Sequence, residues 1–106
     1  MKRMEPFQLT IAKYLGPYIK ERRQLPKSYL GMSQIELANK LGISAQFLGR
    51  VEKGEVPIPH DLQVRMIIEL KIPQAVIRDI YMDAAIERGK ELMKKAESRK
   101  RHHKTL

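Results

Sequence analysis

Residues 31–54, GMSQIELANKLGISAQFLGRVEKG, decide the fold of this chain, because their pattern predicts two short helices joined by a tight turn. Ser33 followed by Glu36 has the spacing of a capping box at the start of the first helix. Apolar residues then recur at helical spacing as far as Gly42, and glycine commonly ends a helix in a left-handed conformation. Ser44 is placed to cap the second helix. The stretch therefore predicts a helix-turn-helix motif.

The same stretch resembles the Cro/cI (XRE-like) phage-repressor family of helix-turn-helix DNA-binding domains. The resemblance runs through SQIELANKLGIS and RVEKG, continues into an apolar helix at residues 62–70, and covers roughly residues 7–75. It implies an all-α fold, a five-helix lambda-repressor-like DNA-binding domain, here with an extended C-terminal helix. It also implies that the second motif helix binds in the major groove, usually within a symmetric dimer.

The regions on either side of the motif complete the expected domain. Apolar spacing predicts a first helix over residues 6–24. We expect a kink or a break in it at residues 16–17, Gly-Pro, because proline removes a backbone hydrogen bond and clashes with the preceding turn. After the motif, the pattern predicts a helix over residues 60–70 and a long helix over residues 74–97.

Composition and charge limit the classes of function. The chain has 106 residues and a formal net charge of +9, which suits a polyanionic partner. It has no cysteine, so disulfides and thiolate metal sites are excluded, and its three histidines do not make a plausible metal cluster. It also lacks a nucleophile–base constellation and a phosphate-cradling glycine loop. We therefore expect neither an enzyme nor a bound cofactor or metal.

No apolar run approaches the ~20 residues of a membrane span, and no signal-peptide pattern opens the chain. We expect a cytoplasmic protein with no membrane partner. We assign residues 1–86 to the DNA-binding domain and residues 87–106 to a charged helical extension with a basic tail. We do not expect the basic run at residues 99–104 to fold; it either frays in solvent or adds non-specific attraction to phosphates. The loop at residues 24–30 is longer than usual and could contact a phosphate.

The exposed face of the second motif helix carries the predicted base contacts. Gln46 and Arg50 are four residues apart, so both side chains can point into one groove. Glutamine can pair with adenine N6 and N7, and arginine with guanine O6 and N7. The alternatives are an ordinary exposed residue at position 46 and a phosphate contact at position 50. The resemblance places the base contacts at Ala45, Gln46 and Arg50, and Ala45 can pack on a thymine methyl.

Three other residues of this helix have structural interpretations. Phe47 either contacts a thymine methyl or inserts beneath the first motif helix, and we favour the core because a lone exposed phenylalanine is unfavourable. Gly49 costs the helix roughly 1 kcal/mol relative to alanine, so we expect a close approach to DNA or to a neighbouring helix there. The resemblance implies that Glu52 pairs with an arginine of the first helix, either Arg22 or Arg23.

Phosphate contacts are predicted around the same motif. Gln34 begins the first motif helix and matches the family position that touches a phosphate, although it could simply be exposed to solvent. The free N–H groups and the dipole of a helix N-terminus favour anions. Further candidates for phosphate contacts are Lys40, Ser44 and Lys53.

Apolar residues that the domain's own core does not need predict a dimer surface around the end of the fourth helix and the start of the fifth. The alternative is that both apolar stripes are used inside one chain. The predicted surface consists of Val64, Ile68, Ile77, Ile80, Tyr81 and Ala84.

The function we expect is sequence-specific binding of double-stranded DNA by a transcriptional regulator. We expect a repressor that acts as a homodimer on a pseudo-palindromic operator. The alternative is the antitoxin of a toxin–antitoxin pair, which represses its own promoter and binds a toxin through residues 87–106.

Overall fold

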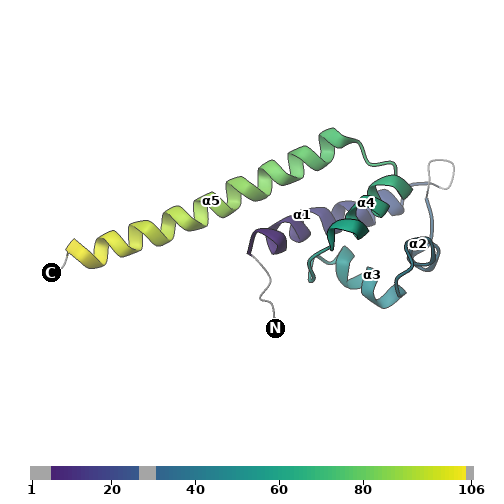
Figure 1. Ribbon diagram of the computed structural model, residues 1–106, viewed down its shortest axis with the longest axis horizontal. Coiled ribbons are helices and arrows are strands. Elements are labelled where there is room, and N and C mark those ends of the chain that lie inside the picture. Colours follow the sequence, from purple (N-terminus) through teal and green to yellow (C-terminus); the bar gives the residue numbers. More distant parts are fainter. Residues whose placement is uncertain (1–5, 27–30, 105–106) are drawn as a thin grey trace.

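The chain forms a bundle of four helices from which a fifth, much longer helix projects (Figure 1). This computed structural model describes residues 6–26 and 31–104, with the backbone alone for Pro6 and for residues 98–104. No strand occurs in these ranges, which confirms the all-α fold class. Most of the loop predicted to contact a phosphate lies outside the described residues. The helices are α1 (Pro6–Arg23), α2 (Gln34–Leu41), α3 (Ala45–Glu52), α4 (His60–Glu69) and α5 (Gln74–Lys104).

Helix α1 continues through Pro17, so the predicted break at residues 16–17 is wrong, whereas the alternative of a kink stays a prediction. Leu15 and Ile19, on either side of the proline, are 2% and 0% exposed. Their burial in the core keeps the two halves of the helix together despite the lost backbone hydrogen bond. Gly16 lies so close to α3 that a Cβ atom there would collide with the carbonyl oxygen of Val51. The glycine is therefore needed for α1 and α3 to pack closely.

The helix-turn-helix motif forms as its capping residues predict. The Ser33 hydroxyl accepts a hydrogen bond of 3.1 Å from the N–H of Glu36 at the start of α2. Gly42 ends α2 in the left-handed region at φ 70°. The Ser44 hydroxyl accepts a bond of 3.0 Å from the N–H of Phe47 at the start of α3. Side-chain oxygens thus satisfy backbone donors that have no partner within either helix.

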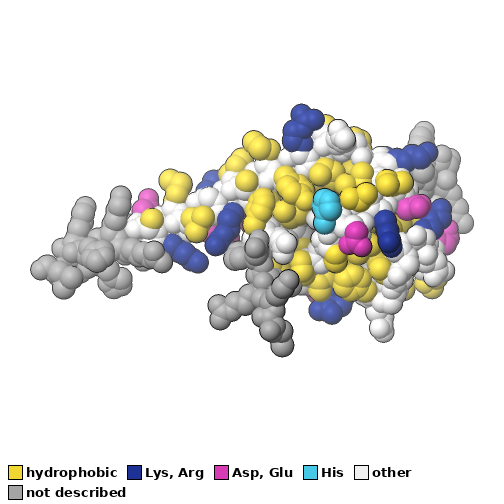
Figure 2. All heavy atoms as spheres, viewed as in Figure 1, with side chains coloured by type: hydrophobic (Ala, Val, Ile, Leu, Met, Phe, Trp, Pro, Cys, Tyr) yellow, Lys and Arg dark blue, Asp and Glu magenta, His cyan; other side chains and the backbone are white. Residues whose placement is uncertain are grey.

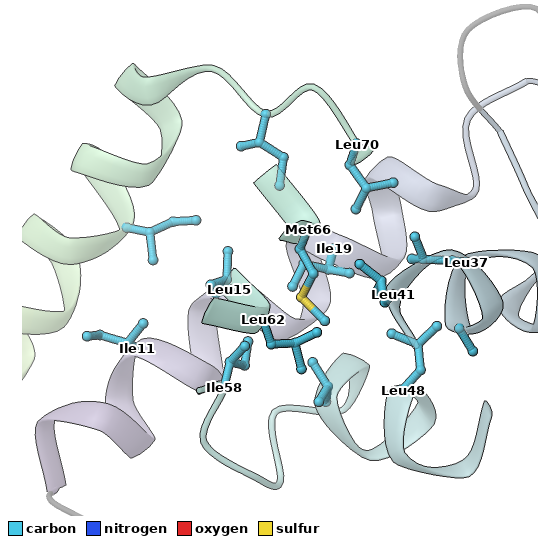
Figure 3. Close-up of a cluster of buried hydrophobic side chains, with 14 of the residues drawn as sticks. Ile11, Leu15, Ile19, Leu37, Leu41, Leu48, Ile58, Leu62, Met66 and Leu70 are labelled. Atoms are coloured by element: carbon cyan, nitrogen blue, oxygen red, sulfur yellow. The ribbon is translucent and has the colours of Figure 1, made fainter. Parts of the chain in front are cut away.

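The hydrophobic core gathers side chains from all five helices and from the loops beside α4 (Figure 3). Burial of these aliphatic side chains is the main favourable term in folding. The labelled core residues are Ile11, Leu15 and Ile19 from α1, Leu37 and Leu41 from α2, Leu48 from α3, and Ile58, Leu62, Met66 and Leu70 from α4 and its flanks.

The side chain of Arg22 caps the C-terminal end of α4. Its Nε donates to the carbonyl oxygen of Leu70 at 2.9 Å, and its Nη2 donates to that of Lys71 at 3.0 Å. Lys71 has a positive φ of 50°, so the chain turns sharply there toward α5. A cation at this end also complements the helix dipole.

Helix α1 lies between α3 and α5 (Figure 1). Its Gly16 side packs on α3. On the opposite side the rings of Phe7 and Tyr81 meet edge to face, with centroids 6.3 Å apart. The Tyr14 hydroxyl donates to Glu87 at 2.8 Å. The order α3, α1, α5 therefore separates the second motif helix from the long helix.

Helix α5 has 31 residues and gives the molecule a long dimension of 64 Å. The basic run at residues 99–104 continues this helix, so the prediction that it does not fold is wrong. Lysine and arginine are good helix formers, and cations are favoured near a helix C-terminus.

No helix in the described ranges is long and apolar enough to cross a membrane.

Candidate nucleic-acid interface

Helix α3 has one face in the core and one in solvent. Leu48 and Val51 are fully buried, whereas Gln46 and Arg50 are exposed. Ala45 is half-buried at the start of the helix. Of the three residues predicted to contact bases, Ala45 therefore lies at the N-terminus of α3. Gln46 and Arg50 lie on its exposed side, on successive turns.

A shallow hollow of about 530 Å³ runs along this face. It brings together five of the predicted DNA-binding residues from two helices, and Gly49 forms part of its floor. A Cβ atom at Gly49 would lie 3.4 Å from Nε2 of Gln34, which is an ordinary contact. Packing of α3 on α2 therefore does not require a glycine here, but the missing side chain keeps the hollow open. Its lining residues are Gln34, Ala45, Gln46, Gly49, Arg50 and Lys53.

A buried polar network fixes the edge of this hollow. The guanidinium of Arg23 donates to Glu52 through Nε at 2.6 Å and through Nη2 at 3.0 Å. Nε2 of Gln34 donates to the same carboxylate at 3.1 Å. Arg23 is thus the partner of Glu52 at the end of α3, and Arg22 has the separate role at α4. Because Gln34 at the start of α2 shares this carboxylate, the network ties together three helices.

Arg50 is only loosely held in the free protein. Its Nε lies 3.9 Å from Oε2 of Glu55, and both side chains are more than half exposed. Such a pair contributes little stability and holds the side chain weakly. The arginine is therefore free to turn toward a base or a phosphate.

Phe47 lies half-buried against the hydrophobic core, the second of its two predicted positions. Its backbone N–H donates to the capping hydroxyl of Ser44 at the start of α3. The ring therefore helps to seat α3, and contact between its exposed part and DNA stays a prediction.

The predicted phosphate contacts divide into two groups. Gln34 and Lys53 border the hollow, and Gln34 begins α2, where backbone N–H groups are free to bind an anion. Lys40 lies at the other end of α2, beside a second hollow that also includes Ile68. The Ser44 hydroxyl accepts the capping bond and can still donate its own proton. Lys40 and Ser44 are thus outside the group that the hollow brings together.

The predicted dimer surface is only partly available. Val64 and Ile68 are 41% and 66% exposed on α4. Ile80 and Ala84 are 8% and 0% exposed, so they belong to the core and are removed from the predicted surface. Packing of α5 on α1 covers them. Ile77 and Tyr81 are half-buried, and the Tyr81 hydroxyl donates to Oε1 of Gln63 at 2.9 Å.

One polar cluster was not predicted from the sequence. Glu87 Oε1 accepts bonds of 2.8 Å from both Lys13 Nζ and the Tyr14 hydroxyl, which fixes α5 to α1. These hydrogen bonds, first from Lys13 and then from Tyr14, hold the pKa of Glu87 below its ordinary value. No local pattern could have revealed the cluster, because Glu87 lies 74 and 73 residues from its partners.

Comparison with known proteins identifies the motif. Residues 19–62 match a family model described as helix-turn-helix. This match agrees with the resemblance of these residues to the XRE-like helix-turn-helix family. The matched region runs from the end of α1 into α4 and includes the hollow on α3. The match supports a role for the chain in DNA binding and transcription regulation.

One curated relative matches part of this chain. Over 49 residues the chain is 47% identical to multiprotein-bridging factor 1 of Pyricularia oryzae (strain 70-15 / ATCC MYA-4617 / FGSC 8958). The overlap covers 46% of this chain and 29% of that protein, so the chain spans less than a third of the relative's length. No solved structure matches the chain.

Proposed function

We propose that the protein reads specific sequences in double-stranded DNA by inserting α3 into the major groove. The observation that carries this proposal is the pairing of exposed Gln46 and Arg50 on successive turns of α3, beside a hollow bordered by the N-terminus of α2. This is the geometry by which a recognition helix presents side chains to base edges.

The chemistry of these side chains favours purine contacts. Gln46 can bind N6 and N7 of an adenine, and Arg50 can bind O6 and N7 of a guanine. Ala45 offers an apolar surface to a thymine methyl. Because Arg23 and Gln34 brace the end of α3 through Glu52, the helix can enter the groove without being reorganised.

Phosphates are bound around this reading surface. The net charge of +9 supplies general attraction, and the free N–H groups at the start of α2 supply a directed contact. Gln34 and Lys53 would hold the backbone on either side of α3, with Lys40 and Ser44 as outer contacts. Binding should therefore weaken steeply as salt increases.

The regulator acts as a homodimer and a repressor in this proposal. A dimer would read a pseudo-palindrome with half-sites about 34 Å apart. The exposed residues Val64 and Ile68 support a contact at the end of α4, to which Ile77 and Tyr81 could contribute their exposed parts. In this proposal the protein binds DNA and does not catalyse a reaction. The predicted cytoplasmic location stays a prediction.

Selection of binding sites from random duplexes at moderate salt tests this function. Wild type should enrich one motif, and Gln46→Ala should lose preference at one base position of that motif. Gln74→Ala, an exposed glutamine on α5, is the matched control and should select the wild-type motif. If wild type enriches no motif, sequence-specific reading is wrong.

A second candidate function is to hold another protein at the DNA. Support comes from the name of the relative, a multiprotein-bridging factor, and from exposed apolar residues on α5. The antitoxin alternative is the case in which that other protein is a toxin. Stoichiometric co-purification of a second protein with wild type, but not with Ile86→Glu, would support this candidate, and a chain that purifies alone would contradict it.

A further inference from the structure

Helix α5 carries an apolar stripe that none of the described side chains covers. Met82, Ile86 and Met93 are 58%, 53% and 66% exposed. With Gly89 and Ala96 they follow the alternating spacing of four and three residues that forms the seam of a coiled coil. Figure 2 shows hydrophobic side chains along the edge of the projecting helix. We call these five residues the α5 stripe.

The domain's own packing leaves the α5 stripe free. Ile80, Ala84 and Glu87 face α1. At 100° per residue their mean direction lies opposite that of the five stripe residues taken together, with Ile86 at the edge of the stripe. Residues 90–97 are exposed on every side of the helix. A helix that projects alone into water is marginal and gains stability by packing an apolar face against a partner.

We propose that the α5 stripe packs antiparallel against the same stripe of a second copy of this chain. In this register Ile86 lies opposite Gly89 of the second copy, and Met82 lies opposite Met93. Each pair occurs twice because the contact is two-fold symmetric. The occupant is thus a copy of this chain.

The size of the stripe residues supports this register. Gly89 costs the helix roughly 1 kcal/mol relative to alanine. A Cβ atom there would meet no described atom within 4 Å, so packing among the described residues does not explain the glycine. Opposite Ile86 the glycine provides room for a large side chain. A parallel pair would place glycine against glycine and leave a gap in the seam.

Charge supports the antiparallel direction as well. Asp83 and Lys90 flank the same side of the α5 stripe and are seven residues apart, too far to pair along one helix. In the antiparallel register Asp83 lies beside Lys90 of the second copy, twice in each dimer. Ala85 and Leu92 of opposite copies meet on the other side.

The pairing places the DNA-binding surfaces on the outside. Since α1 lies between α3 and α5, joining two chains through α5 gives the order α3, α1, α5, α5, α1, α3. The two copies of α3 then face away from each other. Resting on the proposed DNA-binding function, this assembly holds two separate DNA segments. It is distinct from a contact through Val64 and Ile68 on one operator.

Sedimentation of the full chain without DNA tests the contact. Wild type should be a dimer at micromolar concentration, and Ile86→Glu should weaken association at least tenfold. Lys94→Ala, on the same helix but off the stripe, should behave as wild type. A monomeric wild type, or a dimer that Ile68→Glu disrupts and Ile86→Glu does not, overturns the proposal. Circular dichroism checks that each variant remains folded.

Charge exchange tests the partner and the direction. Asp83→Lys and Lys90→Asp should each weaken the dimer, and the double variant should restore it. Rescue requires that the two positions meet between copies. If the double variant is weaker than either single variant, the antiparallel register is wrong.

The absence of cysteine allows a direct crosslinking test. Chains with Met82→Cys, mixed with tagged chains with Met93→Cys, should form mixed disulfide dimers under mild oxidation. Lys95→Cys, on the α1 side of the helix, should not crosslink efficiently to either. Crosslinks that join only like positions would establish a parallel pair and contradict the proposal. Tight binding of the stripe to a different protein, with the chain alone monomeric, would contradict it as well.

A two-duplex assay separates this proposal from the proposed function. Wild type should retain a fluorescent duplex on beads that carry a second duplex, and Ile86→Glu should lose at least ninety per cent of the retained signal. The variant should bind a single duplex with unchanged affinity. If wild type binds single duplexes but retains none on the beads, the back-to-back arrangement is wrong. If it binds no duplex, the DNA-binding function itself fails, and sedimentation still decides the α5 contact.

Discussion

Arg23 and Glu52 form a bidentate ion pair buried between α1 and α3, with Nε–Oε2 and Nη2–Oε1 distances of 2.6 and 3.0 Å. Their side chains are 9% and 2% exposed. Gln34 donates to the same carboxylate. The pair therefore fixes the end of the helix that we propose reads DNA, although it touches no DNA itself.

Removing one member of this pair should destabilise the protein. Arg23→Ala leaves a buried carboxylate without its cation, which typically costs about 3–5 kcal/mol. The double variant Arg23→Met/Glu52→Leu should regain most of that loss, because both charges are removed together. Urea unfolding measures the free energy of unfolding of wild type, of Arg23→Ala and of the double variant. Arg50→Ala is the control and should lose no more than about 1 kcal/mol, since its pair with Glu55 is exposed. A loss below about 1 kcal/mol for Arg23→Ala would contradict the structural role of the pair.

Substitution of two glycines by alanine should change the stability of the protein in opposite directions. Gly16→Ala places a Cβ against the carbonyl oxygen of Val51 and should destabilise the fold by about 1–3 kcal/mol, as overpacking does. Gly49→Ala has room beside Gln34 and should stabilise free α3 by about 0.5–1 kcal/mol. The same methyl group projects into the hollow on α3, so DNA affinity should fall. Thermal unfolding and duplex titration measure the two effects. An alanine at Gly49 that leaves affinity unchanged would show that DNA does not approach this point.

Acid should weaken the attachment of α5 to α1. The pKa of Glu87 is lowered by its hydrogen bonds with Lys13 and Tyr14, so its contribution is complete above the ordinary glutamate pKa. It is lost as the pH falls through the lowered pKa in the folded protein. Melting temperatures of wild type and Glu87→Gln should therefore differ at neutral pH and converge below about pH 4. A difference that stays constant into acid would contradict this linkage.

Local signals explain why the motif could be predicted from sequence. Ser33, Gly42 and Ser44 act on backbone groups within a few residues, so their spacing alone indicates where α2 and α3 begin and end. The exposed positions of Gln46 and Arg50 follow from the same helical period.

The errors arose where distant residues decide the outcome. Local rules predicted a kink or a break at Pro17, and the break is wrong because burial of Leu15 and Ile19 keeps α1 continuous. Helical spacing marked Ile80 and Ala84 as apolar, yet it could not say whether α1 or a second chain covers them. Only the packing of α5 on α1 resolves that choice.

Base readout by α3 is the central claim, and titration of duplexes with single base-pair changes tests it most directly. On the selected site at fixed salt, Gln46→Ala and Arg50→Ala should each lose about 1–3 kcal/mol of binding free energy. Each should also become indifferent to the base pair at one position. Lys40→Ala should weaken every duplex about equally, as loss of a phosphate contact does. If Gln46→Ala and Arg50→Ala keep both the wild-type affinity and the wild-type preference at every position, α3 does not read the bases in this way.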